Sequence, residues 1–338
     1  MTAALLEVRD LTVRLHTSAG LVTVVDQVSL AVEVGQVLGL VGESGSGKSV
    51  TMRAVFGLLP RDAVIEGSVK LDGEELVGLP QRALRRYRGG RMAMIFQDPM
   101  TALNPVLTVG RQIAEAIRLH DPVVSQRDAM ARAADLLDLV VISNPSRRVH
   151  QYPHEFSGGM RQRAVIAMAM ANNPRLLVAD EPTTALDVTV QAQIMDVLRK
   201  LRDNKGVGVI LISHDLGLVA GTADHASVMY GGRVIEHGRV DDLFYRSRHP
   251  YTRGLLASLP KLDGTSDRLF AIGGAPPVPS RRPPGCAFHP RCDHTGDICS
   301  TIVPDLRPVD TVLSACHRAE EIEPADFAPR EVVDEPLA

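Results

Sequence analysis

Residues 42–49 read GESGSGKS and fit the pattern G-x-x-x-x-G-K-[ST]. The apolar run VLGLVG before this loop predicts a buried strand, and residues 48–58 predict a helix, which is the context that the pattern requires. The glycines allow the backbone to curl, so that successive N–H groups and a helix N-terminus face a polyphosphate. Lys48 would then reach the β and γ phosphates, and Ser49 would bind Mg²⁺. An unliganded glycine-rich turn is the alternative reading.

The segments around this loop alternate between strand and helix patterns. Strands are predicted within residues 5–42 and at RMAMIFQ, RLLVAD and VGVILIS. Helices are predicted at 108–119, 125–138, 158–171 and 188–203. Such alternation predicts a layered α/β domain with a largely parallel sheet. The residues expected to contact the nucleotide are Gly42, Glu43, Ser44, Gly45, Ser46, Gly47, Lys48, Ser49 and Val50.

The apolar runs, the N-terminus and the net charge indicate where in the cell the protein works. The apolar runs are far shorter than the roughly 20 residues that cross a hydrocarbon core. The N-terminus MTAALLEVRDL has no pattern of a secretory signal, so we expect a reducing cytoplasm. The net charge of −3, from 37 basic and 40 acidic residues, does not indicate a broad nucleic-acid surface.

The run LLVADEP ends a predicted buried strand with two adjacent carboxylates. Asp180 suits a Mg²⁺ site, and Glu181 can polarise the water that attacks a γ-phosphate. Such a pair can also be a solvated strand end. Its position after a phosphate-binding loop favours the catalytic interpretation.

Further motifs follow in a fixed order: IFQDP, FSGGMRQR, LLVADEPTTALD and LISHD. With them, residues 1 to about 255 resemble the ATPase subunits of ATP-binding cassette (ABC) transporters. The resemblance implies a RecA-like core, an antiparallel β subdomain and a helical subdomain. It also implies a catalytic set of Gln97, Glu181 and His214, Mg²⁺ contacts from Ser49, Gln97 and Asp180, and further nucleotide contacts from Ser157, Gly158, Gly159 and Asp187.

Met160 stands where many cassettes carry glutamine, and the form FSGGMRQR is similar to D-type ATPases of oligopeptide and dipeptide importers. This resemblance implies an enzyme that hydrolyses ATP at the cytoplasmic face of the membrane to energise peptide uptake. It implies four partners: a second ATPase subunit of F type, giving a heterodimer, two transmembrane permease subunits and an extracytoplasmic substrate-binding protein. Nucleic acid is not an expected partner.

In this family an aromatic residue near the end of the second strand often stacks on adenine. No such aromatic residue is evident here, because Leu15 and His16 occupy that region.

Two alternative functions remain open at this point. A soluble ABC ATPase could act on nucleic acid or ribosomes, although the chain shows no coiled-coil insertion, second cassette or strongly basic face. Importers of nickel or glutathione belong to the same branch of the family. The ATPase motifs do not distinguish these substrates from peptides.

The chain changes character after about residue 262, where GGAPPVPSRRPPG is dense in proline and glycine. We therefore predict a cassette at 1–261, a C-terminal extension at 262–320 and a flexible tail at 321–338. The extension holds the chain's four cysteines, Cys286, Cys292, Cys299 and Cys316.

In a reducing cytoplasm these cysteines favour a metal site over disulfides. Their spacing is neither that of common zinc ribbons nor that of bacterial ferredoxins. The segment is similar to the C-terminal extension of the peptide-importer ATPases, and this implies a [4Fe–4S] cluster with four cysteine ligands. Zinc and free thiols are the alternatives, and a histidine could replace one ligand: His289, His294 or His317.

Overall fold

The computed structural model describes residues 4–18, 20–98, 102–184, 186–259 and 272–322. Its central feature is a sheet of eight strands in the order β11-β12-β10-β9-β3-β8-β7-β6. The strands from β9 to β6 are parallel, and β10, β12 and β11 continue the sheet antiparallel to their neighbours. The bounds of the parallel strands are β3 Val37–Val41, β6 Met92–Ile95, β7 Leu176–Asp180, β8 Gly208–Ser213 and β9 His225–Tyr230.

The parallel strands are apolar on both faces because each face is covered. In β3, Val37 and Val41 point into one apolar cluster, and Leu38 and Leu40 point into the other. Successive side chains of a strand point to opposite faces, so a strand buried on both sides must be apolar at every position. This explains why VLGLVG and RLLVAD read as uninterrupted apolar runs.

One face of the main sheet is covered by helix α1 (Lys48–Val55) and by an antiparallel sheet in the order β2-β1-β4-β5. The strands are β1 Leu6–Thr17, β2 Gly20–Val32, β4 Val64–Leu71 and β5 Glu74–Glu75, and the short helix α2 covers Gln81–Leu84. This sheet is the antiparallel β subdomain expected from the sequence.

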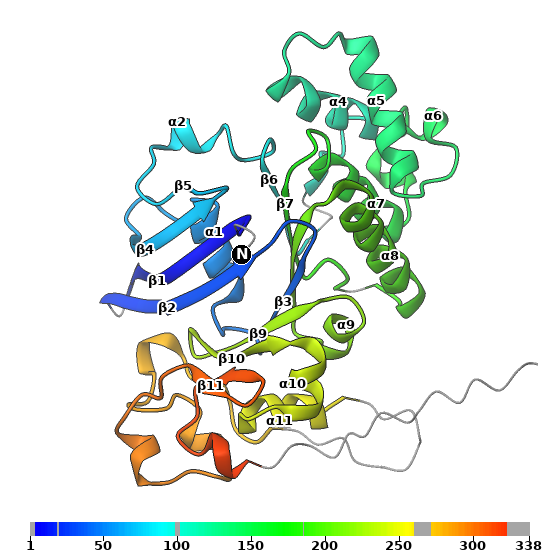
Figure 1. Cartoon of the computed structure of the whole chain (residues 1–338). Helices are drawn as coiled ribbons and strands as arrows, with labels where there is room; N and C mark the ends of the chain where they lie inside the picture. The colour runs from blue at the N-terminus through cyan, green and yellow to red at the C-terminus, as the bar shows by residue number, and fades with distance from the viewer. Residues whose placement is uncertain (1–3, 19, 99–101, 185, 260–271, 323–338) are drawn as a thin grey trace, which may run out of the picture.

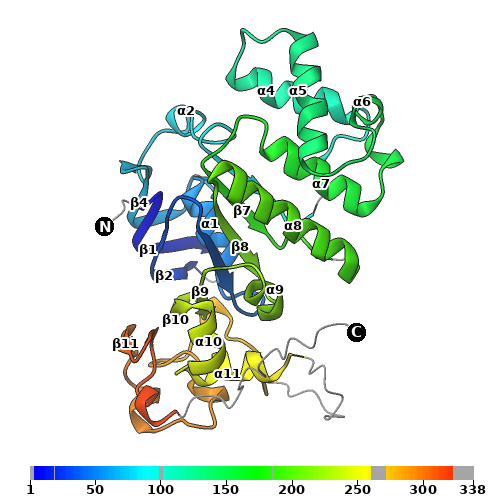
Figure 2. The ribbon, with the colours of Figure 1, turned by 45° about the vertical axis from the view of Figure 1, so that its right-hand side comes forward.

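The other face carries the helices. Helix α4 (Val109–His120), α5 (Gln126–Leu139) and α6 (Pro145–Arg148) form a group that lies beyond the β6 end of the sheet (Figure 1). Helix α7 (Gly158–Ala169) connects this group to the sheet, and α8 (Val188–Lys205) packs beside α7 (Figure 2). Helices α4, α5, α7 and α8 agree with the predicted segments to within a few residues, whereas α6 was not predicted; α4 to α7 form the helical subdomain.

Helix α9 (Leu216–Ala220) lies between β8 and β9 in the chain. Strand β10 (Arg233–Arg239) follows β9, and helices α10 (Val240–Arg246) and α11 (Pro250–Ala257) follow β10. The expected boundary between residues 261 and 262 lies outside the described residues. Beyond it, β11 (Arg307–Val309) and β12 (Val312–Ser314) extend the main sheet, because Glu236 pairs with Ser314 and His237 with Leu313. The extension is therefore continuous with the cassette sheet.

The extension also shares the cassette's core. Phe288, Val312 and Ala315 belong to the apolar cluster on the helical face of the sheet. Ile322 is only 1% exposed, so the packed chain continues past residue 320, where we expected a flexible tail to begin. Burial against the cassette thus contributes to the packing of this proline-rich segment.

None of the helices in the described ranges has the length and apolar character needed to cross a membrane.

Candidate functional site: a phosphate-binding loop and four strand ends

The loop at residues 42–47 joins β3 to α1 and curls as the sequence predicts. Gly42, Gly45 and Gly47 have φ angles of 149°, 81° and 103°, in the region that favours glycine. A Cβ atom on Gly42 would also lie 2.2 Å from the Met229 carbonyl oxygen. The loop can therefore keep its shape only with glycine at this position.

Lys48 begins α1, and its side chain folds back along the loop. Its Nζ atom donates to the carbonyl oxygens of Gly42 (2.7 Å) and Glu43 (3.0 Å). Burial lowers the pKa of Lys48, and the negative charges of Glu181, Asp180 and Glu43 oppose this shift. The Lys48 ammonium group is thus partly desolvated, lies at the N-terminus of a helix and has three acidic residues near it.

Ser49 faces the end of β7. Its Oγ atom donates to Asp180 Oδ1 over 2.9 Å. Burial raises the pKa of Asp180; the Ser49 hydrogen bond opposes that rise, and the negative charge of Glu181 adds to it. This hydroxyl–carboxylate pair offers the hard oxygen ligands that Mg²⁺ prefers.

Three side chains contact the Glu181 carboxylate, two of them from the ends of neighbouring strands. Its Oε2 atom accepts hydrogen bonds from Gln97 Nε2 (2.8 Å) and Thr184 Oγ1 (3.0 Å), and Oε1 lies 3.3 Å from His214 Nδ1. Its φ of 48° places a non-glycine residue in the left-handed region, a strained conformation that is common at functional sites.

The expected catalytic set is thus assembled at one edge of the sheet. Gln97 follows β6, Asp180 and Glu181 end or follow β7, and His214 follows β8, so the carboxyl ends of parallel strands bring them together.

The FSGG segment lies elsewhere. Ser157 caps the N-terminus of α7, where its Oγ atom accepts from the Met160 N–H over 3.3 Å. Asp187 caps α8 in the same way and accepts from Val190 N–H over 2.9 Å. A Cβ atom on Gly159 would lie 2.5 Å from Val190 Cγ1, so the two helices approach closely at this glycine. Within the described residues, no hydrogen bond joins this segment to the loop at 42–49.

The sequence did not single out three residues that contribute to the site. Thr184 supports the Glu181 carboxylate, as described above. Tyr251 on α11 accepts the Glu43 N–H at its Oη atom over 2.8 Å, and Arg291 of the extension pairs with the Glu43 carboxylate. Only the pair of threonines that follows Glu181 and Pro182 could have indicated Thr184. No local sequence signal marks Tyr251 or Arg291.

The four cysteines, although separated in sequence, lie in one neighbourhood as free thiols. Burial raises the pKa of Cys292 to about 11 and of Cys316 to about 12; Cys286 and Cys299 add to both shifts, and Cys292 adds to that of Cys316. Burial and Cys299 similarly raise the pKa of Cys286.

Backbone N–H groups also point at these sulfurs, because hydrogen bonds from the residues that follow them lower the three pKa values; the donors are Phe288, His289, His294 and Arg318. In the part of the chain that the structure describes, no three His, Cys, Asp or Glu side chains are close enough to hold one metal ion together.

Comparison with known proteins agrees with this geometry. The family profile for ABC transporters matches residues 25–184, and the profile for the oligopeptide/dipeptide transporter C-terminal region matches residues 235–299. A solved dimeric ATP-binding cassette in a post-hydrolysis state, bound to ADP and Pi, superposes with a TM-score of 0.62 at 26% identity, covering 70% of this chain and 98% of that one.

Two relatives extend the match to nearly the whole chain. The oligopeptide transport ATP-binding protein OppD of Mycobacterium tuberculosis is 55% identical over 94% of this chain, which spans about half of that relative's length (52%). OppD of Escherichia coli is 46% identical over 94% of both chains. The chain therefore belongs to the ABC transporter family of ATP-binding proteins, in the branch that carries the oligopeptide/dipeptide transporter C-terminal region.

Proposed function

We propose that this chain is the ATP-hydrolysing subunit of an importer for oligopeptides or dipeptides. The observation that carries the proposal is the position of Glu181, a carboxylate held by Gln97 and Thr184 next to the Ser49–Asp180 pair and Lys48. This is the arrangement that in-line attack of water on a γ-phosphate requires: a phosphate cradle, a Mg²⁺ site and a base in one place. The peptide substrate is inferred from the relatives, which are oligopeptide transport ATP-binding proteins.

The Mg²⁺ site fits the side chains present. Asp180 is buried with a raised pKa, so a cation would relieve the cost of its charge, and Ser49 already shares its environment. We assign Ser49, Asp180 and Gln97 as the residues that would hold the ion. Bound there, Mg²⁺ would neutralise charge on the phosphate oxygens.

A second cassette is needed to complete the site. Ser157, Gly158 and Gly159 form a helix N-terminus, which is a ready anion-binding end, but they lie on α7, away from the loop of the same chain. In a head-to-tail dimer this end would cover the γ-phosphate held by the other subunit. The solved cassette bound to ADP and Pi is itself a dimer.

We propose that the second cassette is a distinct F-type subunit and that the pair binds two permease subunits at the cytoplasmic face of the membrane. An extracytoplasmic protein would deliver the peptide. In proteoliposomes, we expect ATP-dependent uptake of labelled peptide only when all five polypeptides are present. Equal uptake with this chain as the only ATPase would reject the heterodimer, and hydrolysis without uptake of any peptide would reject the substrate class.

The permease subunits would dock in an apolar groove between the sheet and the helical subdomain. This groove, about 560 Å³ in volume, lies between the end of β6, α4 and α7. Three large apolar side chains line it while remaining exposed: Leu58 by 40%, Phe96 by 43% and Leu119 by 78%. Phe96 directly precedes Gln97, so a helix seated in the groove would lie one residue from the Glu181 partner. A short cytoplasmic helix of a permease is the occupant we propose.

Leu119→Arg is expected to weaken co-purification of this chain with the permease subunits by about tenfold or more, because a charge would replace an apolar anchor. Binding of MgATP to the isolated chain should be unchanged. Val123→Arg is the matched control, since Val123 is 93% exposed and does not line the groove. Equal assembly of the Leu119 and Val123 variants would place the docking surface elsewhere.

We further propose that Cys286, Cys292, Cys299 and Cys316 bind one [4Fe–4S] cluster. Two features support it: the electrostatic interactions among the four cysteines, and the backbone hydrogen bonds at Cys286, Cys292 and Cys316, since such hydrogen bonds stabilise thiolate ligands. A single zinc ion would need its sulfurs about 2.3 Å from one point. In a cluster each of the four thiolates would instead bind a different iron.

A further inference from the structure

The C-terminal extension reaches the phosphate-binding loop through one buried ion pair. Arg291 Nη1 donates to Glu43 Oε2 over 2.7 Å, and Nη2 donates to Glu43 Oε1 over 3.0 Å. The Arg291 side chain is only 6% exposed, and that of Glu43 is 26% exposed. Glu43 is the second residue of GESGSGKS, so a residue of the extension holds the loop that receives the nucleotide.

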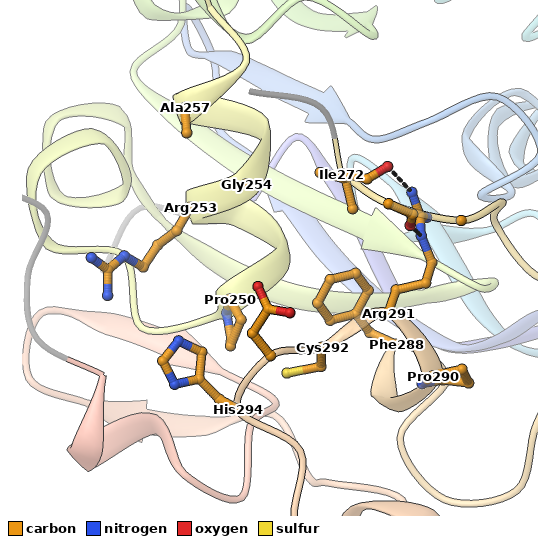
Figure 3. Close-up of a pocket in the computed structure, with 13 residues that line it drawn as sticks. Pro250, Arg253, Gly254, Ala257, Ile272, Phe288, Pro290, Arg291, Cys292 and His294 are labelled. Carbon is orange, nitrogen blue, oxygen red and sulfur yellow. Dashed lines mark hydrogen bonds between the residues drawn. The ribbon is translucent and has the colours of Figure 1, made fainter. Parts of the chain in front are cut away.

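The Arg291 guanidinium is fixed on all sides. Its Nε atom donates to the Gly273 carbonyl (2.7 Å), Nη2 to the Ile272 carbonyl (3.3 Å) and Nη1 to Tyr230 Oη (3.2 Å). With the two bonds to Glu43, these contacts match the five N–H donors that a guanidinium carries. The group also lies over the rings of Tyr230 and Phe288, at 5.7 and 5.9 Å from their centroids. Figure 3 shows Arg291 between Phe288 and the backbone at Ile272, and the next residue in the chain is Cys292.

Glu43 is held at its backbone as well. Its N–H donates to Tyr251 Oη, and its carbonyl oxygen accepts from Lys48 Nζ. Its carboxylate is near enough to Lys48 to oppose, with Glu181 and Asp180, the lowering of that lysine's pKa by burial. An unpaired carboxylate at this position would therefore repel a polyphosphate, and a bidentate arginine both cancels its charge and fixes its direction.

We propose that Arg291 is a positioning residue of the nucleotide site, through which the C-terminal extension is required for tight MgATP binding. This inference rests on the proposed function as an ATPase. It implies that the cassette does not bind ATP independently of the extension. Because Arg291 directly precedes Cys292, the packing of the cysteine region and the charge of the phosphate-binding loop are set by neighbouring residues.

The test is the dissociation constant of MgATP for the purified full chain, measured by titration calorimetry. Arg291→Gln should raise it about tenfold or more, equivalent to about 1.4 kcal/mol. Arg291→Lys, which keeps the charge but loses the bidentate geometry, should give a smaller increase. Arg281→Gln is the matched control: an exposed arginine of the same extension, whose loss should leave the constant unchanged.

The decisive variant is the double one. Glu43→Gln combined with Arg291→Gln should restore binding to within about threefold of the unmodified chain, because the orphaned carboxylate is gone. A merely structural role of Arg291 predicts no such rescue, so a double variant as weak as Arg291→Gln would overturn the inference. Unchanged binding by Arg291→Gln would also overturn it.

Amide hydrogen exchange distinguishes a local effect of the Arg291 substitution on the phosphate-binding loop from unfolding of the whole chain. In Arg291→Gln, amides of residues 42–49 should exchange faster while those of β8 keep their protection. Loss of protection throughout the chain would mean general unfolding and would overturn the positioning role. If the unmodified chain itself failed to bind MgATP, the proposed ATPase function would fall, whereas normal binding that is insensitive to Arg291 would remove this inference alone.

Discussion

Glu181→Gln is expected to slow ATP hydrolysis in the assembled transporter by about 10²-fold or more, within the range that general-base catalysis supplies. Glutamine preserves the size of the side chain and can still contact Gln97 and Thr184, but it cannot accept the proton of the attacking water. MgATP binding should be retained, since the loop at 42–49, Lys48 and Ser49 are unchanged. Steady-state phosphate release and equilibrium nucleotide binding measure the two properties separately.

Glu66→Gln is a suitable control for this variant. Glu66 is an exposed carboxylate on β4 that pairs with Arg14 on the antiparallel sheet, so its loss should leave turnover unchanged. Hydrolysis by the Glu181 variant at the normal rate would remove Glu181 as the base. Loss of nucleotide binding would instead assign it a role in holding the phosphates or Mg²⁺.

The chain purified without oxygen is expected to be brown, with broad absorbance at about 400 nm and about four irons per chain, as a [4Fe–4S] cluster requires. Cys292→Ser should lose most of the iron and the colour, because one thiolate ligand is removed. Iron, sulfide and zinc analysis with the absorbance spectrum would check both results. The extension should then exchange its amides faster, although Phe288 and β12 remain packed on the cassette.

His294→Ala provides the control for the cysteine variant. His294 lies two residues after Cys292 and is one of the three histidines that could replace a cysteine ligand. With four cysteine ligands, His294→Ala should retain its iron. A colourless chain that contains one zinc would contradict the cluster and favour a structural zinc site, and an iron-free His294 variant would make the histidine a ligand.

Some parts of the site could be predicted because their information is local. GESGSGKS combines glycines at positions of positive φ with a lysine and a serine, and no distant residue is needed to recognise it. LLVADEP likewise encodes a buried strand and the two carboxylates that follow it. The resemblance carried by the motifs implied that Gln97, Glu181 and His214 form one catalytic set, and parallel strands place their carboxyl ends at one edge of a sheet. The structure shows that these three side chains meet.

The sequence by itself thus determined the cassette fold, the phosphate-binding loop and the family, because each depends on short patterns and on their order. Only the tertiary structure decided how the extension relates to them. Arg291 and Glu43 are far apart in the chain, and their pairing follows from the packing of Phe288 against Tyr230 and Tyr251. No local periodicity encodes such a contact, since an ion pair between distant segments depends on where the whole fold places its two partners.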